Sequence, residues 1–230
     1  MHIPDGFIDP GTSIATGALA VAGLGIAVKK AGDVLEDREV PLAGLVAAFV
    51  FAAQMLNFPV AAGTSGHLIG GTLAAVLVGP WVGALCIAVV LLVQALFADG
   101  GITALGLNVL NMAMVSGWLG YALFGALRRV VPKSRRSVAG VAGVAAGASV
   151  VLASLAFVAE YAVGGSGGVS IGALASAMAG VHVAIGIGEG VITGATVGMV
   201  LAVRPDLVYA VRSNGARPPT PSPRAEHTPA

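Results

Sequence analysis

The strongest constraint on this chain is a series of long apolar runs that contain almost no charged residues. Of its 230 residues, 57% are hydrophobic and 10% are charged, whereas an ordinary soluble domain has about 45–50% and about 25%. A soluble fold of this size has no interior large enough to hide so much apolar surface, and disordered chains are poor in such residues. The runs therefore indicate helices that span a lipid bilayer.

Charges and Gly/Pro clusters divide these runs into about seven candidate spans. Their ranges are 12–28, 40–58, 67–79, 82–98, 103–127, 138–163 and 170–203. The third is short for a full span. The last is too long for one, so we expect a break near Gly180, Gly186, Gly188 and Gly190. The predicted fold is an all-α, polytopic membrane helix bundle over residues 1–203, followed by a disordered cytoplasmic tail over residues 204–230.

The basic residues predict the orientation of this bundle. All twelve lie after the first, the fifth or the last segment: Lys29, Lys30 and Arg38; Arg128, Arg129, Lys133, Arg135 and Arg136; Arg204, Arg212, Arg217 and Arg224. Short cytoplasmic loops carry the excess of positive charge, so with seven spans the N-terminus lies outside and the C-terminus in the cytoplasm of a plasma-membrane protein. Asp5, Asp9, Asp99 and Glu160 fall on the outer face.

The charge, the cysteine count and the short motifs of the sequence argue against several classes of protein. A net charge of +1, with no basic cluster interleaved with aromatic residues, argues against nucleic-acid binding. The single cysteine, Cys86, excludes an internal disulfide and a cysteine metal cluster. Lys133-Ser134 is the only Lys-Ser/Thr pair and follows Pro132, so there is no P-loop, and any ATP-derived energy must come from partner chains.

The first two residues offer a metal chelate on the outer face. The Met1 α-amine, the backbone nitrogen of His2 and the His2 imidazole can close a five-membered and a six-membered ring around one ion. His67, in an outer loop, can supply a fourth nitrogen, whereas His227 lies in the tail. Planar nitrogen donors suit Ni²⁺ or Cu²⁺, with Co²⁺ close by, rather than Mg²⁺ or Ca²⁺. The alternative is that His2 and His67 are ordinary interfacial polar residues.

Polar side chains inside the apolar runs are the remaining candidates, because they are costly in a bilayer without partners. Gln54 with Asn57, Asn108 with Asn111, and His182 with Glu189 can each share a helix face, and Asp99 lies at an outer turn. They can orient a ligating histidine by hydrogen-bonding to it, or they can simply join helices by hydrogen bonds. For Asp99, attraction of cations and capping of a helix both remain open.

Two other functions fit parts of the sequence. Gly63-Thr64-Ser65-Gly66 matches the motif of rhomboid intramembrane serine proteases, with His182 on a late segment as the base, although Gly186 follows that histidine by four residues where the pattern has three. A stand-alone divalent-cation channel or secondary transporter would also fit and would need no ATPase partner.

Five motifs give a more specific indication. They are MHIPDGF at 1–7, FAAQMLNFP at 51–59, GTSGHL at 63–68, FADGGITALG at 97–106 and GIGEG at 186–190. Together they closely resemble the CbiM/NikM family, the substrate-binding membrane subunits of energy-coupling factor (ECF) transporters for cobalt and nickel. The similarity extends over residues 1–203 in order, and the tail carries no part of it.

The resemblance implies a function and a ligand set. The family holds its metal through positions that match the Met1 amine, the His2 backbone nitrogen and imidazole, and the His67 imidazole. It implies a subunit without ATPase activity or an organic cofactor, which takes up Co²⁺ (for cobalamin synthesis) or Ni²⁺. The implied partners are a transmembrane coupling subunit, two cytoplasmic ATPases and often a small accessory membrane subunit.

Overall fold

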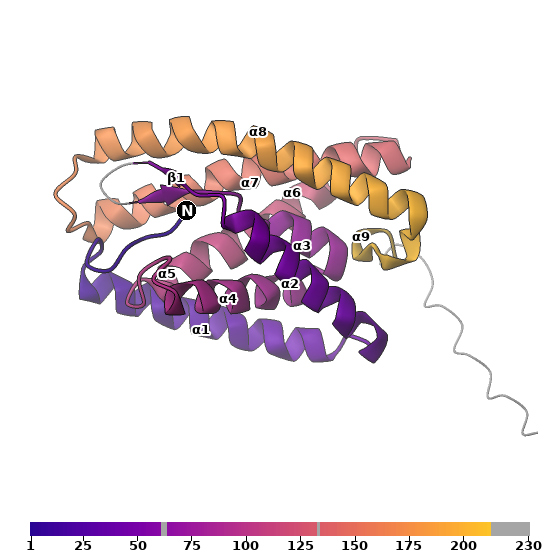
Figure 1. Cartoon of the computed structure of the whole chain (residues 1–230), viewed down its shortest axis with the longest axis horizontal. Coiled ribbons are helices and arrows are strands. Elements are labelled where there is room, and N and C mark those ends of the chain that lie inside the picture. The colour runs from indigo at the N-terminus through magenta and orange to yellow at the C-terminus, as the bar shows by residue number, and fades with distance from the viewer. Residues whose placement is uncertain (61–63, 133, 213–230) are drawn as a thin grey trace, which may run out of the picture.

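The computed structural model describes residues 1–60, 64–132 and 134–212 as one bundle of helices that run along a common long axis (Figure 1). The helices are α1 (Pro10–Gly32), α2 (Val40–Gln54), α3 (Gly71–Val78), α4 (Pro80–Leu96), α5 (Leu105–Val109), η2 (Leu110–Leu119), α6 (Gly120–Leu127), α7 (Arg135–Gly164), α8 (Ile171–Val203) and α9 (Tyr209–Arg212), with short 3₁₀ turns η1 (Asp37–Glu39) and η3 (Pro205–Leu207). In the described part of the chain, the only sheet is an antiparallel pair of two-residue strands, β1 (Phe58–Pro59) and β2 (Ser65–Gly66).

The lengths of these helices agree with a multi-pass membrane protein. Among the described residues, four helical stretches are long and apolar enough to cross a membrane: Pro10–Gly32, Leu105–Leu127, Arg135–Gly164 and Ile171–Val203. α2 and α4 are shorter apolar helices. α3 has eight residues, all buried, and lies inside the bundle where the third apolar segment was expected.

Local sequence explains where the first span begins. Asp9 precedes Pro10, and its Oδ1 accepts hydrogen bonds from the backbone N–H groups of Gly11 (2.8 Å) and Thr12 (3.1 Å). Proline at the first helical position needs no hydrogen-bond acceptor for its nitrogen, and the carboxylate satisfies two of the free donors of the first turn. This cap anchors the start of α1 directly after the N-terminal segment, residues 1–8.

The fifth span is one continuous helical stretch whose centre, η2, is a π-helix. Thr72 Oγ1 of α3 donates a hydrogen bond of 2.8 Å to the carbonyl of Ser116. A side chain that inserts into the backbone ladder is a known cause of such local widening. The π-helix therefore lies where α3 packs most closely against the fifth span.

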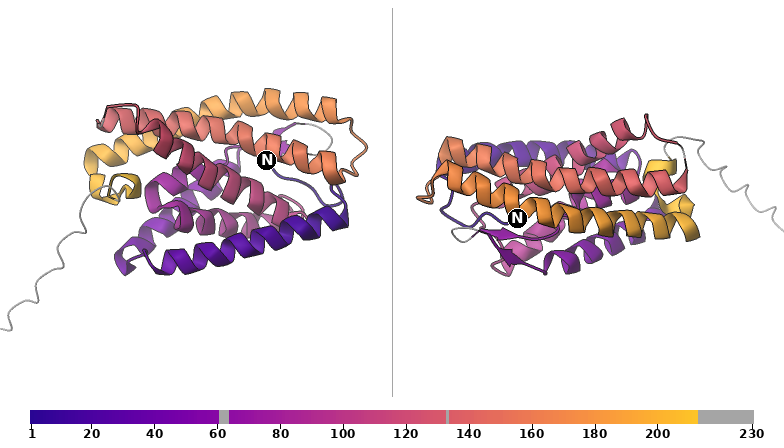
Figure 2. Two further views of the ribbon diagram at one scale, coloured as in Figure 1. Left: turned by 180° about the vertical axis from the view of Figure 1, so that it is seen from behind. Right: turned by 90° about the horizontal axis from the view of Figure 1, so that it is seen from above.

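The last span differs from the sequence prediction. α8 is a single helix of 33 residues, so the break expected near its glycines is wrong. A Cβ atom added to Gly143 or Gly147 of α7 would lie 2.5 or 2.6 Å from the carbonyl oxygen of Gly190 or Gly186. The two helices run side by side along their length (Figure 2). These glycines thus allow close helix packing, as small residues do in membranes.

The end of the chain also differs in part from the sequence prediction. Residues 204–212, expected to be disordered, form η3 and α9, with Val208 and Ala210 buried and Arg212 paired with Glu39. Residues 213–230 lie outside the described part of the chain. The ends of α1, α6 and α8 and the start of α7 lie at the same end of the bundle, so the basic connections gather there (Figure 1).

Candidate metal site

The N-terminal segment enters the bundle instead of lying on its surface. Met1 and Ile3 are completely buried and His2 is 4% exposed. The backbone N–H of Ile3 donates to Asn108 Oδ1 (2.9 Å), and Asn108 Nδ2 donates back to the Ile3 carbonyl (3.3 Å). The N–H of Gly101 donates to the same carbonyl at 2.9 Å. These three bonds hold Ile3 in the bundle, and Figure 1 marks the N-terminus beside the strand labelled β1.

The loop of residues 65–70, here called the His67 loop, supplies the other half of the site. It leaves β2 and enters α3, and His67 within it is completely buried. The backbone N–H of His2 donates to Ser65 Oγ at 3.3 Å. The imidazoles of His2 and His67 lie with ring centroids 4.5 Å apart. The fold thus brings together Met1, His2 and His67, the three residues singled out in the sequence.

The hydrogen bonds of His67 determine which of its nitrogens is free. His67 Nδ1 lies 2.5 Å from the carbonyl oxygen of Leu68, which can only accept, so Nδ1 carries the proton. Nε2 is buried and has no hydrogen-bond partner among the described residues. A histidine that ligates a metal characteristically donates its other N–H to a carbonyl or carboxylate. His67 Nε2 therefore has a free lone pair that can bind a metal.

Gly100 leaves room for the His2 ring. It has φ +97°, and a Cβ atom at this position would lie 2.8 Å from His2 Nδ1. Both the backbone conformation and the space require glycine. His2 Nε2 lies 3.6 Å from Asp99 Oδ2, so Nδ1 faces the glycine while Nε2 faces a carboxylate.

Burial keeps the nitrogen donors neutral. It lowers the pKa of the Met1 amine well below its usual value, against the opposing effects of Asp99 and Glu189. It also lowers the pKa of His2 to about 3, helped by the nearby amine, and that of His67 well below its usual value. Because metals bind the deprotonated forms, these shifts favour ligation at neutral pH.

The outer polar candidates lie at the entrance. Asn57 Nδ2 donates to both carboxylate oxygens of Asp99, at 3.2 and 3.4 Å. Burial, its largest influence, raises the pKa of Asp99, while the amine and Asn57 lower it. A cavity of about 390 Å³ adjoins His2, Ser65, Asp99 and Gly100 and includes the exposed Asp5 at its rim. A larger groove of about 480 Å³ between α7 and α8 has only glycine, alanine, valine and isoleucine in its lining and offers no side-chain ligand.

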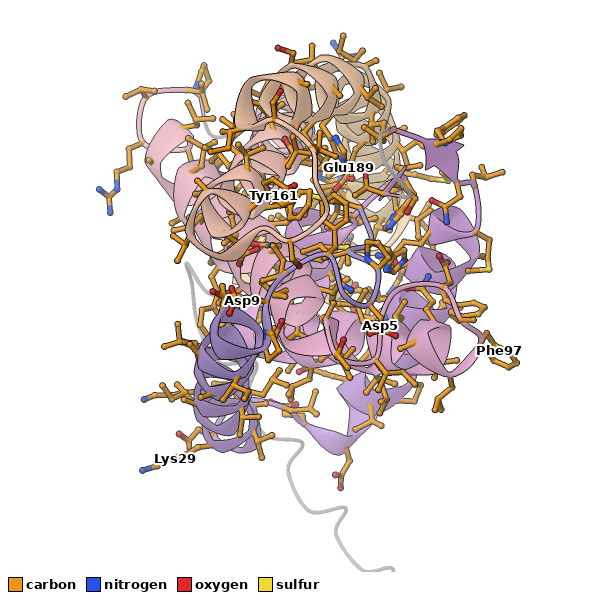
Figure 3. The ribbon with its side chains drawn as sticks, turned by 90° about the vertical axis from the view of Figure 1, so that its left-hand side faces the viewer. Asp5, Asp9, Lys29, Phe97, Tyr161 and Glu189 are labelled. Carbon is orange, nitrogen blue, oxygen red and sulfur yellow. The ribbon has the colours of Figure 1, made fainter. Side chains whose placement is uncertain are left out.

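Two deeper candidates hold the His67 loop. Both carboxylate oxygens of Glu189 accept backbone N–H groups, from Ile69 at 2.5 Å and from Gly70 at 2.9 Å. Gln54 Nε2 donates to the Ile69 carbonyl at 2.7 Å. Figure 3, which views the bundle along its long axis from the left-hand side of Figure 1, shows Glu189 among the helices. The peptide two residues after His67 is therefore fixed from both sides.

The other two candidates form no hydrogen bond with Met1, His2 or His67 in the described part of the chain. Asn111 Nδ2 donates to Glu160 Oε2 at 2.7 Å, one turn away from the Asn108–Ile3 contact. His182 Nδ1 lies 2.8 Å from the Met178 carbonyl, and its Nε2 has no hydrogen-bond partner among the described residues. Ser65 and His182 thus do not form the hydrogen-bonded pair that a serine protease needs.

Several contacts could not be identified from the sequence. Ser65 as the acceptor for the His2 N–H, and Gly101 as a donor to Ile3, depend on residues that are distant in the chain. The only local signal was the glycine pair at positions 100 and 101. In the described ranges, no three His, Cys, Asp or Glu side chains are grouped to hold a metal ion. The site differs from such clusters because two of its candidate donors are an α-amine and a backbone nitrogen.

The fold and this arrangement define a multi-pass membrane protein of the transition-metal transport class. The chain belongs to the CbiM family, whose model, described as the cobalt uptake substrate-specific transmembrane region, matches residues 2–207. This family is a cobalt/nickel uptake component of membranes and not an enzyme, so the protease alternative is wrong.

Individual relatives agree with this assignment. A Haloquadratum walsbyi protein named as a metal transport protein is 40% identical over 93% of this chain and 96% of its own length. The cobalt transport protein CbiM of Sorangium cellulosum is 36% identical over 90% and 94%. The fused nickel transport protein NikMN of Rhodobacter capsulatus is 42% identical over 61% of this chain and 43% of its own. A crystal structure of a truncated transition metal transporter superposes with a TM-score of 0.78 at 32% identity, covering 88% of this chain and 99% of that one.

Proposed function

We propose that this chain is the substrate-binding subunit of an ECF-type importer and captures Ni²⁺ or Co²⁺ at the outer face. The ligands would be the Met1 amine, the backbone nitrogen and the imidazole Nδ1 of His2, and His67 Nε2. The observation that carries this proposal is the convergence of a buried chain terminus with two buried imidazoles. Nitrogen donors near one plane suit Ni²⁺ and Co²⁺, whereas Zn²⁺ prefers a tetrahedron.

Binding requires a change at one backbone atom. The N–H of His2 now donates to Ser65 Oγ. For this nitrogen to bind a metal it must lose its proton, so the metal replaces the contact with Ser65 and a proton is released. The amine and the imidazoles are already favoured as neutral groups by burial.

The proposed orientation places the metal site outside and the basic end of the bundle in the cytoplasm. It rests on the clustering of Lys and Arg at the end opposite the N-terminus. Because the chain has no P-loop, inward delivery would depend on a transmembrane coupling subunit and two ATPases, with a small accessory membrane subunit in some systems. A stand-alone carrier would instead transport the metal without those partners.

The sharpest test alters the chain terminus and leaves both histidines intact. One extra residue before Met1 removes the amine from the chelate and adds bulk to a fully buried position. We expect the affinity for Ni²⁺ or Co²⁺ to fall by about 100-fold or more, measured by calorimetry on the purified protein with an otherwise native N-terminus. His227→Ala, which lies outside the described residues, serves as the matched control and should bind normally. Unchanged affinity in the extended variant would disprove the chelate.

A further inference from the structure

A second polar location lies beyond the His67 loop, deeper in the bundle. α8 presents one buried face, and within residues 182–193 the polar members of that face are His182, Glu189 and Thr193. A small cavity between α2, α3 and α8 is lined by Glu189 and Thr193, by Gln54 of α2, and by Leu68, Ile69 and Gly70 of the His67 loop. The cavity therefore adjoins both the metal-binding loop and the polar face of α8.

Two oxygens at this cavity lack partners. Gln54 and Thr193 are completely buried, and neither Gln54 Oε1 nor Thr193 Oγ1 has a hydrogen-bond partner among the described residues. Glu189 is also completely inaccessible, and each of its oxygens accepts one backbone N–H, which leaves further lone pairs on both. Buried polar atoms without partners are rare in native proteins and characteristically mark a ligand or a water molecule.

Charge also points to a cation here. No Lys or Arg occurs between residues 39 and 127 or between 137 and 203, so no lysine or arginine of these spans can accompany Glu189, and the Met1 amine, whose charge would act on Glu189, is favoured as neutral by burial. Ionisable residues inside a bilayer are costly unless they are paired, and they commonly mark ion pathways. The peptide N–H groups of Ile69 and Gly70 offset only part of the cost. The missing positive charge would then come from the transported ion.

The size and depth of the cavity fit a single transient ion. The cavity has a volume of about 10 Å³. One water molecule needs roughly 10–15 Å³ on the same measure, so the cavity is just large enough for a single small particle. Val181 and Ile185 of α8 lie beside Gly66, at the start of the His67 loop. Glu189 lies beside Ile69 and Gly70, at its end. Glu189 and Thr193 follow Ile185 along α8, which at about 1.5 Å per residue places them roughly 6–12 Å closer to the basic end of the bundle.

We propose that Gln54, Glu189 and Thr193 form a second, oxygen-donor cation site, which the metal occupies after it leaves the nitrogen ligands. This inference rests on the proposed function, because it makes the cavity a step on the inward route of the same ion. Carboxylate, amide and hydroxyl oxygens bind Ni²⁺ and Co²⁺ less tightly than nitrogen donors and suit Mn²⁺. A weaker site deeper in the bundle allows release instead of trapping.

Mn²⁺ is the probe that separates the two sites. In the His2→Ala/His67→Ala protein, reconstituted in nanodiscs, electron paramagnetic resonance should detect about one bound Mn²⁺ per chain. Adding Thr193→Val, which removes the hydroxyl and keeps the shape, should weaken Mn²⁺ binding by about tenfold or more. Thr196→Val is the matched control, since it makes the same change on α8 outside the cavity lining, and it should leave Mn²⁺ binding unchanged.

A second measurement keeps the nitrogen ligands in place. The unaltered protein, first saturated with Ni²⁺, should still bind Mn²⁺, and Thr193→Val alone should reduce that binding while Ni²⁺ affinity stays within about twofold. Absence of Mn²⁺ binding in both experiments, or equal effects of Thr193→Val and Thr196→Val, would overturn the second site. Ni²⁺ binding by the unaltered protein tests the nitrogen site separately, so failure of the proposed function would be recognised independently.

Discussion

The two halves of the candidate metal site are built differently. The first three residues start at the free chain end and are held by Asn108 and Gly101, from one stretch of the chain, and by Ser65, whereas residues 6–8 are bonded to Gly165 and Ser166. The His67 loop is continuous with β2 and α3 at its two ends and is also bonded to α2 and α8 through Gln54 and Glu189. One half is a docked terminus, and the other is an integral part of the helix bundle.

Because the two halves are held differently, changes in them should affect metal affinity and the stability of the bundle differently. Disturbing residues 1–3 should displace metal ligands while the bundle stays folded, because residues 6–8 keep their own bonds to Gly165 and Ser166. Disturbing the His67 loop should damage both, because the same hydrogen bonds join three helices inside the bilayer. The comparison therefore predicts which variants lose affinity alone and which also lose stability.

The largest effect is expected at Glu189. Glu189→Leu leaves the N–H groups of Ile69 and Gly70 unpaired in the bundle interior. At about 1–3 kcal/mol for each unpaired group, we expect a loss of about 2–6 kcal/mol of stability together with metal binding. Thermal unfolding in detergent and calorimetry with Ni²⁺ measure the two. Glu160→Gln, at a half-buried carboxylate that accepts a hydrogen bond only from Asn111 among the bonds described, should keep its metal affinity. A stable Glu189→Leu protein would contradict the role given to the His67 loop.

A smaller and more selective effect is expected at Asn108. Asn108→Leu removes both of its hydrogen bonds to Ile3, so the first three residues keep only the bonds from Gly101 to Ile3 and from His2 to Ser65. Metal affinity should fall by about 10–100-fold, with the bundle still folded as judged by circular dichroism. Asn111→Leu makes the same change three residues along and affects a contact with Glu160 instead. Equal losses of affinity in the two variants would show that the Asn108 contact has no special part in binding.

The smallest effect is expected from a single methyl group at Gly100. Gly100→Ala adds a Cβ atom within 2.8 Å of His2 Nδ1 at a position with φ +97°. We expect metal affinity to fall by about tenfold as the ring is displaced. Gly168→Ala is the matched control, because Gly168 also has positive φ (+69°) but no heavy atom within 4 Å of the place that a Cβ would take. If both substitutions changed Ni²⁺ affinity equally, backbone strain rather than contact with His2 would be responsible.

Part of this arrangement was predictable from local sequence. The spans follow from runs of apolar residues, and the start of α1 follows from Asp9 and Pro10, because hydrophobic burial and capping act over a few residues. Met1, His2 and His67 were selected because few other residues of the outer face can donate nitrogen to a metal. That they bind one remains a prediction, although the fold brings them together.

Other features needed the folded molecule. From the sequence, the glycines of α8 predicted a break in the helix, yet α8 is continuous and these glycines pack against α7. A glycine weakens its own helix, but it also lets a second helix approach closely. The sequence did not distinguish His182 and Asn111 from Glu189 and Asn108. Only the packing showed that Glu189 and Asn108 hydrogen-bond to the His67 loop and to Ile3, whereas His182 and Asn111 bond to Met178 and Glu160. Residues 204–212 looked like part of a disordered tail until their burial against the bundle was visible.

The sequence by itself determined that this chain enters a membrane and where its charges gather, and it reduced the candidates for holding a transition metal to a few residues. These properties follow from composition and short-range order, since the transfer of apolar segments into lipid depends on each segment alone. The tertiary structure alone decided how Ile3 meets Asn108 and how Glu189 caps the His67 loop, across separations of 105 and 120 residues. Such contacts depend on which helices pack together, and no local pattern in the chain records that choice.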